Sequence, residues 1–145
     1  IPAGLGEPVY GKLDALLSFA MLSLPAVKGF EIGSGFESVK MRGSSHNDLF
    51  IKKENKIETK TNHAGGILAG ISTGMPIIGR VAFKPASSIK MELPSLNTKG
   101  KKAAFKLPEG SRHDPCVAIR AVPVVKAMLA IVLMDAVLVN RCAKI

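Results

Sequence analysis

The residues from Ala127 to Val139 form the most apolar stretch of the chain, and Asp135 is the one charged residue within it. Pro123 suits the first turn of a helix, because that turn leaves its backbone N–H groups unbonded. We therefore predict a helix from about Val124 to Asn140. It is apolar on nearly every side, so we expect other layers, here β-sheets, to enclose it. The stretch is too short for a bilayer, so the sequence predicts a buried helix and no transmembrane segment.

The composition indicates one globular domain with a strong positive charge. The 145 residues have a mass of 15.3 kDa, and 47% of them are hydrophobic while 21% are charged, a balance that argues against general disorder. The net charge of +9 would attract nucleic acid, anionic lipid or phosphorylated small molecules. Single-strand binders interleave aromatic residues for base stacking, and this chain has no Trp and one Tyr. A basic module that binds nucleic acid or another polyanion is therefore the alternative interpretation.

The cysteines bear on the cellular compartment of the chain, and the first residues bear on whether it is a piece of a longer protein. Cys116 and Cys142 are too few for a disulfide scaffold, and no Cys-x-x-Cys pair is present, so we expect a reducing cytoplasm. The chain begins with Ile1 in a loop-like segment and shows no leader pattern. We interpret it as a piece of a longer protein.

The first part of the chain contains a regular apolar pattern. Apolar residues at i, i+3, i+4, i+7, i+8 and i+11 predict a helix from about Lys12 to Leu24: Leu13, Leu16, Leu17, Ala20, Met21 and Leu24. A short strand is expected over Ala26–Ile32. A second strand over Glu37–Arg42 would pair back across the glycines that follow the first. The polar segment at about 43–61 is interpreted as a solvated flap or extended hairpin.

The segment from Asn62 to Gly74 is rich in glycine but keeps large apolar residues between the glycines. Gly66, Gly70 and Gly74 are four apart, so a helix would present them as one smooth face, whereas a loop would free backbone N–H groups for a ligand. Neither Gly-x-Gly-x-x-Gly nor Gly-Lys-Ser/Thr occurs there, so the segment is a weak signal for phosphate binding.

A strand predicted over Ile77–Phe83 ends in Lys84-Pro85-Ala86-Ser87-Ser88. A lysine charge with hydroxyl and backbone donors is suited to a phosphate group. Lys-Pro followed by serines is also common in ordinary turns, so both interpretations stay open. The polar residues from Lys90 to Glu109 predict a hairpin-like excursion.

A dense polar cluster, Ser111 to Cys116, precedes the C-terminal helix. Its His113 and Asp114 could act as an acid/base pair, or Asp114 could form an ion pair with Arg112 or Arg120. Cys116 is interpreted as a small buried residue. Zinc would need more ligands than His113, Cys116 and His63 supply, so no metal site is predicted.

Several of these motifs, in order and in register, resemble chorismate synthase over essentially the whole chain. They are Gly4-Leu5-Gly6-Glu7-Pro8, Leu13-Asp14-Ala15, Pro25 to Phe36, Asn62-His63-Ala64-Gly65-Gly66-Ile67, Lys84-Pro85 and Arg112-His113-Asp114-Pro115-Cys116. The resemblance is to the C-terminal part of that family. It implies an α/β (α+β) fold in which helices are sandwiched between antiparallel β-sheets.

The resemblance also implies the family's chemistry, which is anti 1,4-elimination of phosphate from 5-enolpyruvylshikimate 3-phosphate to give chorismate. That reaction requires reduced FMN although it brings no net redox change. A pocket for an anionic substrate and a flavin phosphate would account for the net charge of +9 without nucleic acid. The family's homotetrameric, cytoplasmic state is implied as well, with no membrane partner.

The resemblance assigns roles to individual residues. Flavin contacts are implied at Pro25, Ala26, Ala69, Lys84, Pro85, Ala86, Ser87, Ser88 and Arg112. Lys84 and the serines would serve the phosphate side of the flavin, and Asp114 would handle a proton near its ring. Asn62 and His63 would line or support the pocket.

The chain also departs from the family pattern. Lys126 stands where the family usually has glutamate, and Ala69 stands where most members have glycine. Family members are considerably longer, and the part that carries the acid/base histidines and several substrate-binding arginines has no counterpart here. We therefore expect this chain alone to have little or no synthase activity.

Overall fold

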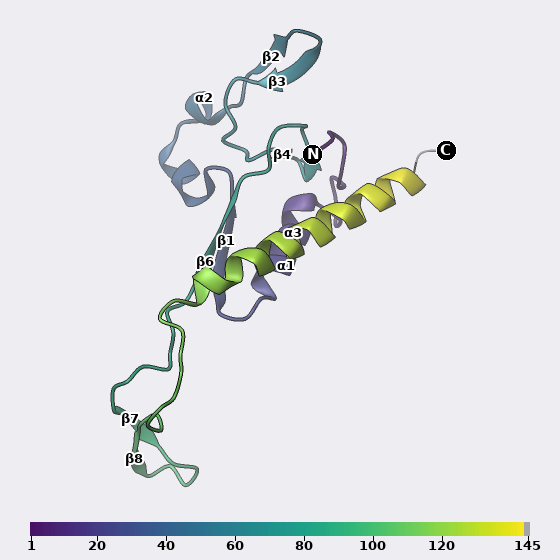
Figure 1. The fold of residues 1–145 in the computed structure, drawn as a ribbon. Coiled ribbons are helices and arrows are strands. Elements are labelled where there is room, and N and C mark those ends of the chain that lie inside the picture. The colour runs from purple at the N-terminus through teal and green to yellow at the C-terminus, as the bar shows by residue number, and fades with distance from the viewer. Residues whose placement is uncertain (144–145) are drawn as a thin grey trace.

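The computed structural model describes residues 1–143, and Figure 1 shows its course. The elements, in chain order, are α1 (Leu13–Leu22), β1 (Val27–Ile32), the 3-10 helix η1 (Gly35–Lys40), α2 (Gly43–His46), β2 (Phe50–Lys53), β3 (Lys56–Thr59), β4 (Ile67–Leu68), β5 (Ile71–Ser72), β6 (Gly79–Phe83), β7 (Leu93–Leu96), β8 (Lys102–Phe105) and α3 (Val117–Cys142). This is the mixed α/β composition that the sequence predicts.

The core lies where α1 packs between α3 and the ribbon formed by β1 and β6 (Figure 1). The predicted apolar face of α1 is confirmed except at Leu16, because Leu13, Leu17 and Met21 are almost completely buried while Leu16 is 39% exposed. Asp14 lies in its first turn, where a negative charge favours the helix dipole. The helix ends just before Pro25, which cannot continue it. Burial of this face holds the rest of the fold in place.

The central ribbon consists of β1 and β6, which pair antiparallel from Val27 opposite Phe83 to Ile32 opposite Gly79. The predicted strands over 26–32 and 77–83 are therefore confirmed to within two residues. Three further two-stranded sheets, β2–β3, β4–β5 and β7–β8, are local hairpins. The β2–β3 and β7–β8 hairpins project from opposite ends of the molecule (Figure 1).

The predicted strand over Glu37–Arg42 is wrong, because these residues form η1 and the bend that follows it. The Glu31 carboxylate accepts the backbone N–H of Phe36 at 2.9 Å, which favours a tight helical turn directly after β1. The strand that pairs with β1 is β6. Val39, an apolar residue of the predicted strand, is consequently left 80% exposed.

The C-terminal helix is longer than the prediction of about Val124 to Asn140. It begins at Val117, so Pro123 lies inside it instead of in its first turn. Proline removes one helical hydrogen bond, but Pro123 is exposed and water can satisfy the carbonyl it leaves free. Within residues 1–143 only one side of α3 is covered, so the expected sandwich has one of its two sides here.

The observed length of α3 contradicts the expectation that the apolar stretch is too short to cross a bilayer. Val117–Cys142 is long and apolar enough to cross a membrane by length and composition, and only 6% of its most apolar window is buried. A core helix of a globular protein can pass the same test of length and apolar composition.

The glycine-rich segment from 62 to 74 adopts the loop alternative. Its glycines have positive φ angles, and β4 and β5 form a minimal hairpin around Ala69 and Gly70. A Cβ on Gly66 would lie 2.5 Å from the carbonyl oxygen of Pro76. Close backbone approach, and not a smooth helix face, explains the glycines.

Candidate functional site

A cavity of about 270 Å³ opens at one end of the β1–β6 ribbon. Its lining joins three segments that are distant in the sequence: Ala26, Lys84, Pro85, Ala86, Ser87, Ser88, His113, Asp114 and Val117. Most of the residues that the sequence singles out around Lys84 therefore meet Asp114 at one place. We call it the ribbon-end cavity.

Backbone pairing brings the first two segments of the cavity together. The N–H of Lys84 donates to the carbonyl of Ala26 at 2.8 Å, which continues the ribbon by one hydrogen bond beyond its last strand pair. Ala26 has a φ of 67°, so the chain turns sharply as it enters β1. The turn places the Ala26 backbone beside the Lys84–Ser88 segment.

The start of α3 closes the third side of the cavity. Val117 is its first residue, and Cys116 caps it without a side-chain hydrogen bond. The first N–H groups of a helix carry a partial positive charge and favour an anion. The Lys84 ammonium and the hydroxyls of Ser87 and Ser88, which line the same cavity, are donors that also suit an anion.

Asp114 is the acidic group of this cavity. Its Oδ1 lies 3.3 Å from Nη2 of Arg120, one turn into α3, and the two side chains are 38% and 79% exposed. This is one of the ion pairs that the sequence left open. Pairs this exposed contribute at most about 1 kcal/mol to stability, so the ion pair orients the carboxylate more than it holds the fold.

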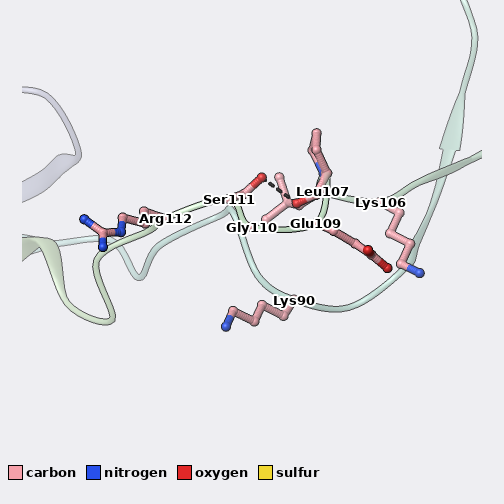
Figure 2. A pocket seen from close by; sticks show the side chains of 8 residues that line it. Lys90, Lys106, Leu107, Glu109, Gly110, Ser111 and Arg112 are labelled. Carbon is pink, nitrogen blue, oxygen red and sulfur yellow. Dashed lines mark hydrogen bonds between the residues drawn. The ribbon is translucent and has the colours of Figure 1, made fainter.

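Arg112 lies in a neighbouring cavity and not in the ribbon-end cavity. That second cavity, of about 390 Å³, is lined by Lys90, Lys106, Leu107, Pro108, Glu109, Gly110, Ser111 and Arg112. Ser111 donates to the carbonyl of Pro108 at 2.6 Å, and the Arg112 side chain extends away from Glu109 and Lys106 (Figure 2). The 111–114 segment thus divides between two cavities, with Ser111 and Arg112 in one and His113 and Asp114 in the other.

Pro25 and Ala69 also lie outside the ribbon-end cavity. Pro25 lines a small apolar hollow with Phe83 and Val124. Ala69 stands in the turn between β4 and β5 with a φ of 50°, next to Gly70, whose carbonyl accepts the N–H of Leu13. The described residues therefore do not bring Ala69 to Lys84.

Asn62 and His63 belong to a cross-linked loop at the other end of the ribbon. Asn62 accepts the N–H of Gly66 at 2.7 Å and donates to the carbonyl of Pro76 at 2.8 Å. His63 Nδ1 lies 3.0 Å from Oγ of Ser34. Both side chains are engaged in holding the loop, so they support the fold here instead of lining the ribbon-end cavity.

Asp48 holds that loop together through its carboxylate, and no sequence pattern predicts this role. Its carboxylate accepts the N–H groups of His63 and Ala64 at 2.8 Å each and the hydroxyl of Thr61 at 2.7 Å. Burial by itself would raise the pKa of Asp48, but these hydrogen bonds and the nearby His63 outweigh it and lower the pKa below 3.8. Asp48 lies in the polar segment at about 43–61, where other charged residues surround it in the sequence and no pattern distinguishes it.

The structure also bears on Cys116 and on the candidate metal ligands. Cys116 is exposed, so its interpretation as a buried residue is wrong, because it stands just outside the first turn of α3. Among residues 1–143, no group of three or more His, Cys, Asp or Glu side chains is arranged to hold a metal ion.

Fold and cavity define a mixed α/β protein with a polar cavity, lined by Lys84, two serines and Asp114, at the end of an antiparallel ribbon. Residues 1–138 match the family model described as chorismate synthase. The chain belongs to the chorismate synthase family.

Individual relatives agree with this assignment. A chorismate synthase of Protochlamydia amoebophila is 61% identical over 97% of this chain and 38% of its own length. One from Opitutus terrae is 53% identical over 93% of this chain and 37% of its own length. A solved structure titled "Crystal Structure of Chorismate Synthase" superimposes with a TM-score of 0.74 at 33% identity, over 97% of this chain and 34% of that chain. The chain thus spans well under half the length of the relatives it matches.

Proposed function

We propose that this chain is the C-terminal portion of a chorismate synthase and carries the flavin-phosphate side of its active site. The observation that carries the proposal is the ribbon-end cavity, which joins the Lys84–Ser88 segment to Asp114. In the complete enzyme the reaction is anti 1,4-elimination of phosphate from 5-enolpyruvylshikimate 3-phosphate, in a cytoplasmic homotetramer.

The residues fit one end of FMN and not the whole molecule. Lys84, Ser87, Ser88 and the first turn of α3 offer a charge, two hydroxyls and backbone N–H groups, which is the donor set a phosphate prefers. Pockets that enclose a whole ligand of this size range from about 300 to 1,000 Å³, and the cavity measures about 270 Å³. We therefore assign the phosphate and the adjoining chain of the flavin to this cavity.

When bound, reduced FMN would supply transient electron density to the substrate while phosphate leaves. The chain's own contribution is orientation and proton handling. Arg120 holds Oδ1 of Asp114 at 3.3 Å, which leaves Oδ2 as a free acceptor for a proton lost from the substrate ring. Arg112, in the adjacent cavity with Lys90 and Lys106, adds positive charge beside an anionic substrate.

Titration with reduced FMN under anaerobic conditions, followed by calorimetry, tests the phosphate assignment. Riboflavin, which lacks the phosphate, is the matched control. We expect FMN to bind at least about tenfold more tightly than riboflavin, because charge-assisted hydrogen bonds to phosphate contribute about 1.5–3 kcal/mol. Equal affinities for the two flavins would refute the assignment.

Two further measurements separate this function from its alternatives. The purified chain is expected to form little or no chorismate by itself, so a measurable rate from the chain alone would contradict the proposal. Binding of duplex or single-stranded nucleic acid that weakens steeply with salt, without any flavin affinity, would favour the basic polyanion-binding module instead.

A further inference from the structure

A small hollow of about 180 Å³ lies on the β1–β6 ribbon and is separate from the ribbon-end cavity. Its lining comes from β1, β6 and η1 and includes Gly29, Glu31, Phe36, Arg80 and Ala82. The two linings have no residue in common. We call it the ribbon-face hollow.

The ribbon-face hollow lies on the side of the ribbon that faces away from the core. Phe30, between Gly29 and Glu31 in β1, packs against the core. Successive side chains of a strand point to opposite faces. Gly29 and Glu31 therefore lie on the outer face, together with Ala82 and Arg80, which are opposite them in β6. Both residues of β6 are exposed, as this placement requires.

Gly29 and Ala82 form a floor without large side chains. A Cβ on Gly29 would make its nearest contact with Cβ of Ala82 at 3.5 Å, an ordinary van der Waals distance, and Gly29 has no positive φ angle. Neither packing nor backbone geometry requires glycine at this position, in contrast to Gly33 and Gly66. The missing side chain leaves a flat surface on which a ring can lie.

Glu31 fixes the two walls of the ribbon-face hollow. Its Oε2 accepts the backbone N–H of Phe36 at 2.9 Å, and its Oε1 lies 2.7 Å from Nε of Arg80. Both oxygens of this carboxylate are thus engaged, and its side chain is only 22% exposed. The contact through Nε leaves the terminal NH2 groups of Arg80 for another acceptor. One wall is therefore an aromatic ring and the other a guanidinium held in place.

We propose that the ribbon-face hollow binds a small aromatic carboxylate. The ring of the ligand lies on the Gly29–Ala82 floor beside Phe36, and the terminal NH2 groups of Arg80 hold its carboxylate. A planar guanidinium recognises a carboxylate through two parallel hydrogen bonds, and aromatic rings pair favourably with one another. This binding does not depend on the flavin assignment, because the two cavities have separate linings.

Other small ligands suit the ribbon-face hollow less well. Among its lining residues, which all lie within 1–143, Arg80 is the one cation and Glu31 the one anion. The balanced charge gives a polyphosphate little attraction, and an ammonium group would find both oxygens of Glu31 engaged. The volume of about 180 Å³ is below the roughly 300 Å³ at which pockets for drug-sized ligands begin. It suits one ring with its acid group.

Titration of the isotope-labelled 145-residue chain with benzoate, followed by NMR, tests the proposal. Resonances of residues 29–36 and 79–82 should shift, and a ligand of about nine heavy atoms should give a Kd on the order of 1 mM. Benzamide and acetate are the matched control ligands, since the first lacks the charge and the second lacks the ring. Each should bind at least about tenfold more weakly than benzoate, because it loses one of the two contacts.

Variants locate the binding site. Gly29→Val fills the floor with a residue that strands favour, so benzoate binding should weaken at least about tenfold while circular dichroism stays the same. Gly43→Val is the matched control, because Gly43 has no positive φ either and a Cβ there would meet nothing within 4 Å. Arg80→Lys keeps the charge but loses the planar fork, and it should also weaken binding about tenfold. Should Gly29→Val alter the circular dichroism, Ala82→Leu fills the same floor from the other strand.

Four results would overturn the proposal. One is the absence of shifts at residues 29–36 and 79–82 with benzoate at about 20 mM, well above the expected Kd. Another is binding of acetate or benzamide as tight as that of benzoate. The third is benzoate binding that stays unchanged in both Gly29→Val and Ala82→Leu. The fourth is displacement of benzoate by saturating reduced FMN, which would place the acid in the ribbon-end cavity.

Discussion

The two ends of the β1–β6 ribbon are built in opposite ways. At one end, the backbone N–H of Gly33 donates to the carbonyl of Ile78 and that of Ser34 to the carbonyl of His63, and the side chains of Ser34 and Asp48 add further bonds to His63. At the other end, one backbone bond from Lys84 to Ala26 joins the segments, and the polar side chains face a cavity. The tied end has satisfied its polar groups internally, whereas the open end keeps them available for a ligand. Substitutions at the two ends should therefore differ in kind.

The largest effect is expected from Gly33→Ala at the tied end. Gly33 has a φ of 57°, and an added Cβ would collide with the His63 carbonyl and lie 2.6 Å from the Gly65 nitrogen. Backbone strain and overpacking together should lower the free energy of unfolding by about 3 kcal/mol. Urea denaturation followed by circular dichroism measures this change. Gly100→Ala, whose Cβ would meet nothing within 4 Å, is the matched control, and equal losses for both would contradict the prediction.

Asp48→Asn should have the next largest effect. The amide keeps one acceptor oxygen but places an NH2 group against a backbone N–H, so about 2 kcal/mol of stability should be lost at neutral pH. Thermal denaturation measures the loss. Glu58→Gln, which removes a charge from a long exposed ion pair of the same flap, should change little.

The pH dependence of the Asp48 contribution follows from the sign of its shift. The folded pKa lies below the ordinary value of 3.8, so the folded state favours the ionised carboxylate. The stabilisation is complete above the unfolded pKa and disappears as the pH falls through the folded value. The difference between wild type and Asp48→Asn should therefore be constant above about pH 5 and shrink below pH 3.8. A difference that grows on acidification would show that the sign is wrong.

At the open end, Lys84→Ala should change binding and leave stability intact. Lys84 is exposed, so its loss should not alter the denaturation midpoint. Affinity for FMN should fall about tenfold while affinity for riboflavin stays the same, because a charged contact to phosphate is removed. Lys101→Ala, in the distant β7–β8 hairpin, controls for net charge. An equal loss of FMN affinity in both variants would indicate a general field effect and not a site.

The smallest effect is expected from Ala26→Gly, which mirrors the glycine substitution at the tied end. Ala26 has a φ of 67°, a conformation that costs an L-residue roughly 1–2 kcal/mol. Glycine removes that strain, but its freer unfolded chain offsets about half of the gain. A net stabilisation of about 0.5 kcal/mol is expected by urea denaturation. A destabilised variant would show that the Ala26 methyl packs against its surroundings.

Sequence patterns were sufficient where a residue's neighbours are close in the chain or share a period. The spacing of Leu13, Leu17 and Met21 predicts α1, and the serines after Lys84 predict the polar lining of the cavity. The patterns failed where the structure of a residue depends on a segment that is distant in the sequence. Nothing local shows that β6 takes the edge of β1 or that Asp48 reaches across to His63. The start of α3 was predicted wrongly from Pro123, because an exposed proline is tolerated inside a long helix.

Helix α3 also dictates when this chain can fold during synthesis. The cluster around Leu5, Leu13 and Leu17 is completed by Ala136, near the other terminus. Contacts that join the first and last parts of a chain form only after the intervening loop is closed, and nascent chains emerge N-terminal part first. The part of the α1 apolar face around Leu13 and Leu17 must therefore wait on the ribosome without its α3 contacts until Ala136 has emerged, while Met21 can already pack on the β1–β6 ribbon. Chaperone demand should be greatest in that interval.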